Sequence, residues 1–308
     1  MGFGQGAERD HLTPEDAFAA YEAVRARLPD ASRPGACVRA GSLDDLAGDF
    51  DVFLLDAFGV LNIGETAIPG VVDRIAGLKA RGKRVLVVTN AAGHPHAKLL
   101  ERYTRLGYDF DPADVISSRA ALVAGLSAGP SRNWGMMASA GYGLGEADGV
   151  IATYLREDAE VYARADAFLL LGSAEWTDAR QALLEAALLE RPRPVYVGNP
   201  DIVAPRETGF SVEPGYYAHR LADRTGVQPQ FFGKPFGTIY DLAFARLGPV
   251  ARDRVLMVGD SLHTDVLGAQ AAGIASALVA GYGFFAGHDI LTPIERSGIR
   301  PDFILDRP

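Results

Sequence analysis

An acidic residue, Asp56, stands directly after a short apolar run at residues 52–55 of this sequence. Four apolar residues in a row, bounded by Asp51 and Asp56, predict a strand that is buried on both faces. Gly59 lets the chain turn away three residues later. In an open parallel sheet, side chains at the carboxyl ends of strands line the ligand crevice. Asp56 is therefore placed for chemistry, although a solvated acid that only ends a strand is the simpler interpretation of any single Asp.

Further polar side chains accompany Asp56, most of them directly after strand-like runs. They are Thr89 and Asn90 after residues 84–88, Lys234 in a Gly-Lys-Pro sequence, Asp260 after residues 255–258, and Asp265. Taken singly, each has a plain structural interpretation, such as a surface lysine or an acid at a helix N-terminus. As a set they suit phosphoryl transfer, which needs an in-line nucleophile and positive groups around the phosphoryl oxygens.

The order and wording of these motifs resemble the haloacid dehalogenase superfamily. The sequences Val-Thr-Asn at 88–90, Gly-Lys-Pro at 233–235 and Gly-Asp-Ser-Leu-His-Thr-Asp-Val at 259–266 are most similar to its NagD-like, C2-capped (class IIA) branch. The resemblance covers about residues 50–305, with all four motifs in the family's order. It implies an α/β fold: a Rossmann-like parallel sheet core with helices on both faces and an inserted α/β cap domain of the C2 type.

The resemblance assigns a role to each motif. Asp56 is the expected nucleophile, which forms an aspartyl-phosphate and so splits one difficult step into two. Lys234 offers a positive charge both to Asp56 and to the phosphate of the substrate. The Thr89 hydroxyl and the Asn90 backbone N–H complete the phosphate-binding cradle.

A magnesium site is expected beside the nucleophile. Asp56, Asp260 and the backbone carbonyl of Phe58 offer oxygen ligands of the kind that Mg²⁺ prefers. In the family, the second acid of the last motif holds metal-bound water or the loop, and here that acid is Asp265. Mg²⁺ is therefore the expected cofactor.

Phe58 departs from the family pattern. Phosphatases of this superfamily usually carry a second Asp two residues after the nucleophile, as general acid and then general base. A phenyl ring can do neither, and the loss is expected to cost ~10²–10⁴-fold in rate. The resemblance therefore implies a Mg²⁺-dependent phosphatase of small phosphomonoesters whose activity is weak or selective for the leaving group.

Two other functions stay open. The sequence Asp-Ala-Phe-Gly at 56–59 also resembles the opening motif of the haloacid dehalogenases themselves, which displace halide from carbon without a metal. Those enzymes have no use for Asp260 and Asp265, so phosphate and Mg²⁺ are favoured. The other alternative is a catalytically weak relative that binds a phosphorylated ligand without turning it over. Phe58 favours this alternative, and the retained nucleophile and lysine oppose it.

Histidines near these motifs are candidates for the missing acid, although a solvated or structural role is simpler for each. They are His94, His96, His219 and His263.

The 308 residues exceed the usual size of one domain, so two domains are expected. Residues 1–129 and 229–308 are predicted to form the core, with residues 1–50 as an accessory helical extension. The motifs are absent between 130 and 228, where helix and strand signals continue. In the C2-capped family the cap is inserted at this place.

Asn199-Pro200-Asp201 follows a strand-like run within the expected cap. A similar sequence occurs in the family on the substrate side of the cap, which makes Asn199 and Asp201 candidate substrate-side residues. By itself the sequence is an ordinary turn signal. Near the N-terminus, Thr13 and Pro14 predict a helix to about Leu28, which either packs on the core or serves a homodimer contact.

The composition indicates the general class of protein. A formal net charge of −9 argues against a nucleic-acid partner, and a lone cysteine, Cys37, cannot form an internal disulfide. No apolar stretch approaches the ~20 residues of a membrane span, and no signal pattern is seen. We therefore expect a cytoplasmic enzyme that acts on a small phosphorylated metabolite.

Overall fold

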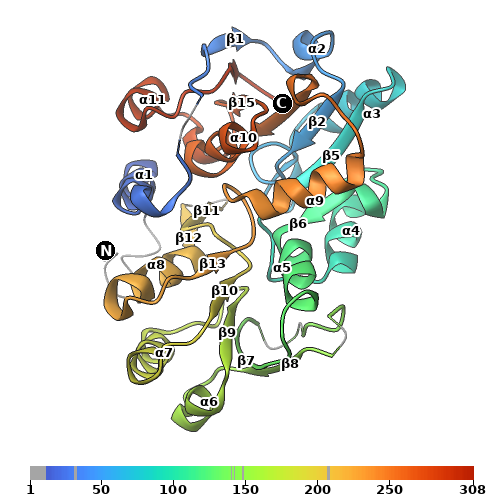
Figure 1. Ribbon diagram of the computed structural model, residues 1–308. Helices are drawn as coiled ribbons and strands as arrows, with labels where there is room; N and C mark the ends of the chain where they lie inside the picture. The colour runs from blue at the N-terminus through green and yellow to red at the C-terminus, as the bar shows by residue number, and fades with distance from the viewer. Residues whose placement is uncertain (1–11, 31–32, 140, 142, 148, 207–208) are drawn as a thin grey trace.

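The computed structural model describes residues 12–30, 33–139, 141, 143–147, 149–206 and 209–308. Its two largest sheets have seven and five strands and lie in different parts of the molecule, one above the other in Figure 1. We call the seven-stranded sheet with its helices the larger lobe, and the five-stranded sheet with its helices the smaller lobe.

The larger sheet is parallel throughout, with the strand order β1-β16-β15-β14-β2-β5-β6. Its strands are β1 (Val38–Ala40), β2 (Val52–Leu55), β5 (Arg84–Thr89), β6 (Val115–Ser117), β14 (Val255–Gly259), β15 (Ala275–Val279) and β16 (Phe303–Leu305). Strands β14, β2 and β5 are neighbours. Because they run parallel, the residues that follow them, Asp260, Asp56 and Asn90, meet at one edge of the sheet.

Helices cover both faces of this sheet, as the alternation of side chains along β2 shows. Phe53 and Leu55 pack with α2 (Leu43–Leu46), α3 (Val71–Ala80) and α4 (His96–Arg105). Val52 and Leu54 point the other way and pack with α5 (Ser118–Ser127), α9 (Gly237–Leu247) and α10 (Leu267–Ala272). All four side chains are buried, so the expected Rossmann-like α/β fold is confirmed.

The smaller sheet is also parallel, in the order β13-β10-β9-β7-β8. Its strands are β7 (Asn133–Met137), β8 (Ile151–Tyr154), β9 (Ala167–Leu170), β10 (Val195–Val197) and β13 (Gln230–Phe231). Strand β13 lies after residue 228, the predicted end of the cap. It nevertheless belongs to the smaller sheet, because it pairs with β10. The division into core and cap domains itself stays a prediction.

Three helices and a hairpin complete the smaller lobe. The helices are α6 (Ala159–Arg164), α7 (Asp178–Glu190) and α8 (Pro214–Thr225). Side chains of all three pack on Phe168 and Leu170 of β9, and the opposite face of the sheet packs towards α5 of the larger lobe. The antiparallel hairpin β11 (Val203–Pro205) and β12 (Phe210–Val212) lies between the smaller sheet and the larger lobe in Figure 1.

The N-terminal segment contains a helix and a strand. Helix α1 (Pro14–Ala23) begins at the predicted cap, where Thr13 and Asp16 form a capping box. It ends earlier than predicted, and a single 3₁₀ turn (Arg25–Arg27) follows. Strand β1 then joins the edge of the larger sheet beside β16, so the segment predicted as an accessory helical extension also contributes a strand to the core sheet. A strand of only three residues gives too short a pattern to be detected from sequence.

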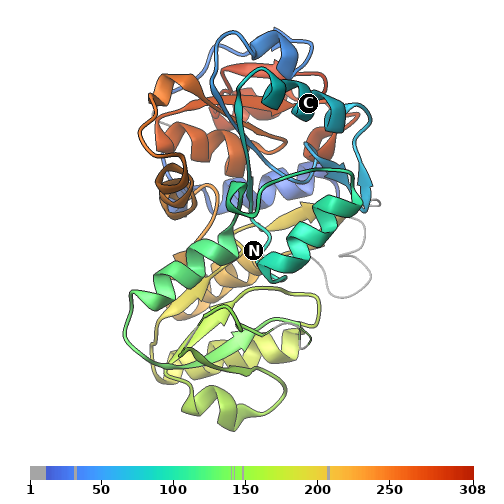
Figure 2. The same cartoon turned by 90° about the vertical axis from the view of Figure 1, so that its right-hand side faces the viewer.

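Further elements lie in the larger lobe. They are the hairpin β3 (Asn62–Ile63) and β4 (Thr66–Ala67), a π-helical turn (Leu262–Val266) that leads into α10, and α11 (Leu291–Ser297). Figure 2, a quarter turn from the first view, shows the larger lobe above and the smaller lobe below, with helices lying between the two sheets.

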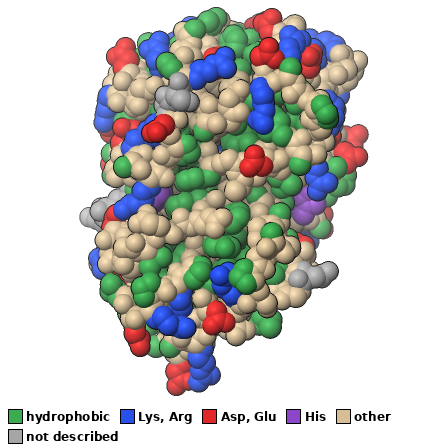
Figure 3. All heavy atoms as spheres, viewed as in Figure 1, with side chains coloured by type: hydrophobic (Ala, Val, Ile, Leu, Met, Phe, Trp, Pro, Cys, Tyr) green, Lys and Arg blue, Asp and Glu red, His purple; other side chains and the backbone are tan. Residues whose placement is uncertain are grey.

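Two observations concern possible partners. Among the described residues, no helix has the length and apolar character that crossing a bilayer requires. On the face shown in Figure 3, acidic and basic side chains are interspersed rather than gathered into a broad basic surface. Nucleic-acid-binding proteins usually display such a basic surface.

Candidate active site

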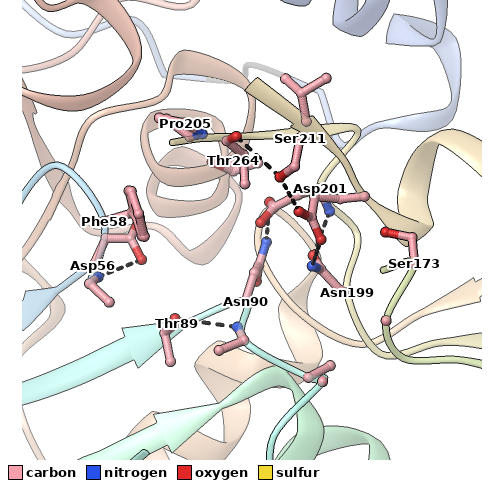
Figure 4. A pocket seen from close by; sticks show the side chains of 18 of the residues that line it. Asp56, Phe58, Thr89, Asn90, Ser173, Asn199, Asp201, Pro205, Ser211 and Thr264 are labelled. Carbon is pink, nitrogen blue, oxygen red and sulfur yellow. Dashed lines mark hydrogen bonds between the residues drawn. The ribbon is translucent and has the colours of Figure 1, made fainter. Parts of the chain in front are cut away.

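A pocket of about 330 Å³ lies between the two lobes, at the carboxyl edge of the larger sheet. It is lined by these predicted site residues: Asp56, Phe58, Thr89, Asn90, Asn199, Asp201, Lys234 and Asp260. Asp265 is buried directly behind them, in contact with Lys234. Figure 4 shows that the labelled side chains come from both lobes and converge on one space.

Lys234 is the charge that links the acidic residues. Its Nζ lies 2.6 Å from Asp56 Oδ1 and 2.8 Å from Asp265 Oδ1, and its side chain is only 2% exposed. Burial opposes a charged ammonium, but Asp265 and Asp56 outweigh it and hold the pKa of Lys234 above its usual value. The lysine is therefore a fixed positive charge beside Asp56.

Asp56 is buried and held in one orientation. Burial raises the pKa of Asp56 to about 6, against the pull of Lys234. The Ala57 backbone N–H donates to Asp56 Oδ1 at 2.7 Å, which fixes the orientation of the carboxylate. At neutral pH most molecules therefore carry Asp56 in its ionised, nucleophilic form.

The three carboxylates fit a divalent metal ion. Asp56, Asp260 and Asp265 each offer an oxygen, and these oxygens lie within 4.8 Å of one another. Among the described residues, Lys234 pairs with two of these acids, Asp56 and Asp265. Burial followed by repulsion from Asp265 and Asp56 raises the pKa of Asp260 well above its usual value. A hard cation with a preference for oxygen ligands would relieve this excess of negative charge.

Glycines make the close packing around these acids possible. Gly59 has a φ of +72°, and a Cβ there would lie 2.5 Å from Asp260 Oδ2. A Cβ on Gly259 would lie 2.0 Å from Asp265 Cγ. Both distances are far below van der Waals contact, so any side chain at either position would displace a carboxylate. Backbone N–H groups then orient the acids, from Phe284 to Asp260 Oδ2 at 2.8 Å and from Ser261 to Asp265 Oδ2 at 3.1 Å.

The Asn90 side chain joins the two lobes. Its Oδ1 accepts from the Lys234 backbone N–H at 2.7 Å, and its Nδ2 donates to the Lys234 carbonyl at 2.9 Å. Nδ2 also donates to Asp201 Oδ1 at 2.7 Å (Figure 4). The sequence analysis assigned a role only to the backbone N–H of Asn90, so this use of its side chain was missed.

The Asn-Pro-Asp loop presents a buried carboxyl group with a raised pKa to the pocket. Asn199 Oδ1 accepts from the Asp201 N–H at 2.9 Å, and Asn199 Nδ2 donates to Glu213 at 3.1 Å. Burial raises the pKa of Asp201 to about 8, although the hydrogen bond from Asn90 opposes this. At neutral pH Asp201 is therefore mainly a neutral acid that can donate a proton.

Phe58 lies between two arginines that come from different lobes. The guanidinium carbons of Arg102, on α4, and Arg206, beside β11, each lie 5.9 Å from the centre of the Phe58 ring. Both distances are within the range of a cation–π interaction. The ring therefore forms part of a cationic wall of the pocket.

The four candidate histidines lie in different places. Of the four, His94 is the one that lines the pocket, where desolvation, Arg102 and Arg119 lower its pKa. His96 Nε2 contacts the Pro112 carbonyl at 3.1 Å. His219 is buried against the Phe231 ring, and His263 Nε2 lies 2.6 Å from Glu22 Oε1. Nothing in these contacts brings His96, His219 or His263 to the pocket.

Several pocket residues were missed by the sequence analysis as members of a site. They are Tyr21, Arg102, Tyr103, Arg206, Ser211 and Glu213. Tyr21 falls within the helix that Thr13 and Pro14 predict, which does not mark it as a site residue. No motif marks the others, so their sequence offers no signal.

Comparison with known proteins identifies the family. A family model for haloacid dehalogenase-like hydrolases matches residues 53–142, and a HAD-hydrolase-like model matches residues 231–307. The chain is 31% identical over 243 residues to a D-glycerol 3-phosphate phosphatase of Mycobacterium tuberculosis, covering 77% of this chain and 65% of that protein.

Solved structures show the same fold. A possible sugar phosphatase of the HAD superfamily from Cytophaga hutchinsonii matches with a TM-score of 0.77 and 25% identity, over 88% of this chain and 98% of the other. NagD from Escherichia coli matches with a TM-score of 0.64 and 21% identity, over 84% and 96% of the two chains.

Fold and site together define a two-lobed α/β enzyme with an aspartate at the carboxyl edge of a parallel sheet. The chain belongs to the haloacid dehalogenase superfamily, in its NagD-like class IIA branch. The predicted enzyme class, a HAD-type phosphatase, is confirmed as well.

Proposed function

We propose that the protein is a Mg²⁺-dependent phosphatase that hydrolyses a small phosphomonoester through an aspartyl-phosphate on Asp56. The observation that carries this proposal is the position of Lys234, whose Nζ touches both Asp56 and Asp265 in a buried cluster of three acids. Asp56, Asp260 and Asp265 would hold the metal ion. When bound, it would supply positive charge to the phosphoryl oxygens and so let an anionic nucleophile approach an anionic substrate.

The residues of this chain divide the work in two steps. In the first, an Asp56 oxygen attacks phosphorus, and the new O–P bond forms as the bond to the leaving oxygen breaks. Lys234 keeps Asp56 ionised and offers charge to the phosphoryl group, with the Thr89 hydroxyl and the Asn90 N–H as further donors. In the second step, water attacks phosphorus and Asp56 is released as a carboxylate with inorganic phosphate.

The proton for the leaving oxygen needs a source other than Phe58. Asp201 is the first candidate, since it lines the pocket with a pKa of about 8 and is protonated at neutral pH. His94 is the second, although its lowered pKa suits a base better than an acid. In the absence of a working acid, the enzyme would prefer aryl or acyl phosphates, whose leaving groups need no proton.

The substrate class follows from the pocket and the relatives. A volume of about 330 Å³ suits a small metabolite. The relatives named above are a D-glycerol 3-phosphate phosphatase and a possible sugar phosphatase, so polyol and sugar phosphates are the first compounds to test. The smaller lobe and its hairpin supply hydroxyl, amide and charged groups for such a substrate, including Ser173, Asn199, Ser211 and Arg206.

The test is a screen of phosphorylated metabolites, p-nitrophenyl phosphate and one 2-haloacid, each with Mg²⁺ and with excess chelator. Metal-dependent phosphate release supports the proposal, and unchanged activity in chelator contradicts it. Halide release without metal would support the dehalogenase alternative. Metal binding has its own readout, because a ligand that prefers the folded state raises the melting temperature.

Two further predictions belong with this proposal. Subcellular fractionation would test the cytoplasmic location, and analytical ultracentrifugation would test the homodimer.

A further inference from the structure

Helix α1 bridges the two lobes beside the pocket. In Figure 1 it lies between α11 of the larger lobe and α8 of the smaller lobe. Glu15 of α1 pairs with Arg296 of α11 at 2.6 Å, and Arg27, just after α1, pairs with Asp223 of α8. Apolar side chains of α1, α8 and α11 belong to one buried cluster. This helix therefore packs on both lobes at once.

On the larger lobe, α1 contacts the π-helical turn that contains Asp265. Glu22 Oε1 lies 2.6 Å from His263 Nε2, and His263 is 1% exposed within the π-helical turn that contains Asp265. The Tyr21 ring stacks on the imidazole with centres 5.1 Å apart and planes at 11°, and the Phe18 ring meets it edge-on at 5.3 Å. The imidazole therefore cannot turn without breaking contacts with α1.

On the smaller lobe, α1 holds the loop that carries Asp201. The backbone N–H of Ile202 donates to the Tyr21 hydroxyl at 3.1 Å. Tyr21 is 2% exposed and Ile202 is fully buried, so water cannot readily replace this partner. Tyr21 also lines the pocket. One side chain thus contacts His263 in the larger lobe and the loop of Asp201 in the smaller lobe.

We infer that α1 is an active-site element, in which Tyr21 and Glu22 are positioning residues. Tyr21 fixes the Asp201 loop against the larger lobe, and Glu22 fixes the turn of Asp265 through His263. A site assembled from two lobes needs such fixed contacts between them, because a displacement of ~1 Å can cost ~10²-fold in rate. The helix lies outside the segment that carries the family motifs. The activity part of this inference rests on the proposed phosphatase function.

The first test is Tyr21→Phe, which removes one hydroxyl and keeps the ring stacked on His263. It leaves a buried N–H without a partner, so we expect the exchange of the Ile202 amide to accelerate by about tenfold. We expect kcat for an alkyl phosphate to fall by about tenfold, with KM changed less than twofold and the melting temperature lowered by only a few degrees. Unchanged Ile202 exchange, or an unchanged kcat in an active enzyme, would overturn the inference.

The second test compares two substitutions of Glu22. Glu22→Ala removes the partner of His263, whereas Glu22→Gln keeps an oxygen that can accept from Nε2–H. We expect Glu22→Ala to lower kcat by about tenfold and Glu22→Gln to restore most of it. Equal losses in both variants would contradict the positioning role. Glu15→Ala is the matched control, because it breaks an exposed contact of the same helix away from the pocket and should leave kcat unchanged.

The exchange measurement separates the two proposals. If the wild type hydrolyses no phosphomonoester, the proposed function fails. Faster Ile202 exchange in Tyr21→Phe would still support the positional role of α1. If the wild type is active but the Ile202 exchange is unchanged in Tyr21→Phe, the proposed function stands and the positioning role of α1 fails.

Discussion

The two walls of the pocket are built differently. On the larger lobe, Lys234, Asp260 and Asp265 are at most 3% exposed, and ion pairs or backbone N–H groups hold each of them. On the smaller lobe, the Arg206 side chain is 49% exposed and stands on a two-stranded hairpin. Its partner Glu213, directly after the second strand of the hairpin, is buried.

From this difference we expect the larger lobe to carry out the reaction and the smaller lobe to select the substrate. Groups at the ends of buried parallel strands keep their geometry whatever the substrate, as phosphoryl transfer requires. An exposed arginine on a hairpin can adapt to the substrate at low cost. We therefore expect substitutions in the larger lobe to change kcat and substitutions in the smaller lobe to change KM. Asp201 is the expected exception, because it comes from the smaller lobe but is bound to Asn90.

The largest effect is expected at the nucleophile. Asp56→Asn cannot form an aspartyl-phosphate, so kcat should fall by at least ~10³-fold. Lys234 keeps Asp265 as a partner, so the fold should persist. Steady-state kinetics and thermal unfolding of the purified variant check both statements. Full turnover by the variant would refute the assignment of Asp56.

A loss of ~10²-fold in kcat for alkyl phosphates is expected for Asp201→Asn if this residue is the acid. Asn keeps the oxygen that accepts from Asn90 but transfers no proton. The acid form is the active one, so the wild-type rate should fall as the pH rises through about 8. The variant should lack that dependence. If it instead keeps the wild-type rate and pH profile, His94 is the next residue to replace.

Phe58→Asp should raise the alkyl phosphate rate, by about tenfold or more, provided the new carboxylate reaches the leaving oxygen. Aryl phosphate turnover should change little, since an aryl leaving group needs no proton. The comparison is the ratio of alkyl to aryl kcat under saturating Mg²⁺, in wild type and variant. An alkyl rate that is already ordinary in wild type would show that another acid acts.

Arg206→Gln should raise KM by about tenfold and leave kcat near its wild-type value, because it removes a charged group from the selecting wall. Arg164→Gln is a matched control on the same lobe, since the Arg164 side chain is 79% exposed on α6. A drop in kcat without a change in KM would remove the distinction between the two walls.

The smallest effect on activity is expected at His219, which lies in α8 of the smaller lobe. Burial, and then Arg27, lower its pKa to about 4, below the ordinary value of 6.5. Between these values the unfolded state binds more protons, so the stability due to neutral His219 is present above pH 6.5 and lost as the pH falls towards 4. His219→Phe should therefore lose less unfolding free energy than wild type on acidification, by up to about 3 kcal/mol. Chemical denaturation at several pH values measures this, and parallel curves would contradict it.

Much of the larger lobe could be predicted because its signals are local. An apolar run followed by a polar residue was enough to predict β2, β5 and β14. Parallel pairing then places the ends of these strands together. Strand β13 escaped because two residues carry no periodic pattern. Its place in the smaller sheet follows from pairing with β10 alone.

Helix α1 shows the limit of such signals most clearly. Its start was predicted from Thr13 and Pro14, but such a local signal does not tell what the helix packs against. The Glu22–His263 contact joins residues 241 positions apart, and the Tyr21–Ile202 contact joins residues 181 apart. No local pattern could connect them.

By itself, the sequence determined the class of fold, the family and the acids and lysine at the strand ends, since each depends on short motifs and on apolar runs. Only the tertiary structure decided which side chains complete the pocket, which histidine reaches it, and that the N-terminal helix spans both lobes. The physical reason is that these features depend on how separate elements pack against one another. Packing is a property of the folded chain, because many apolar faces of similar composition can cover the same surface.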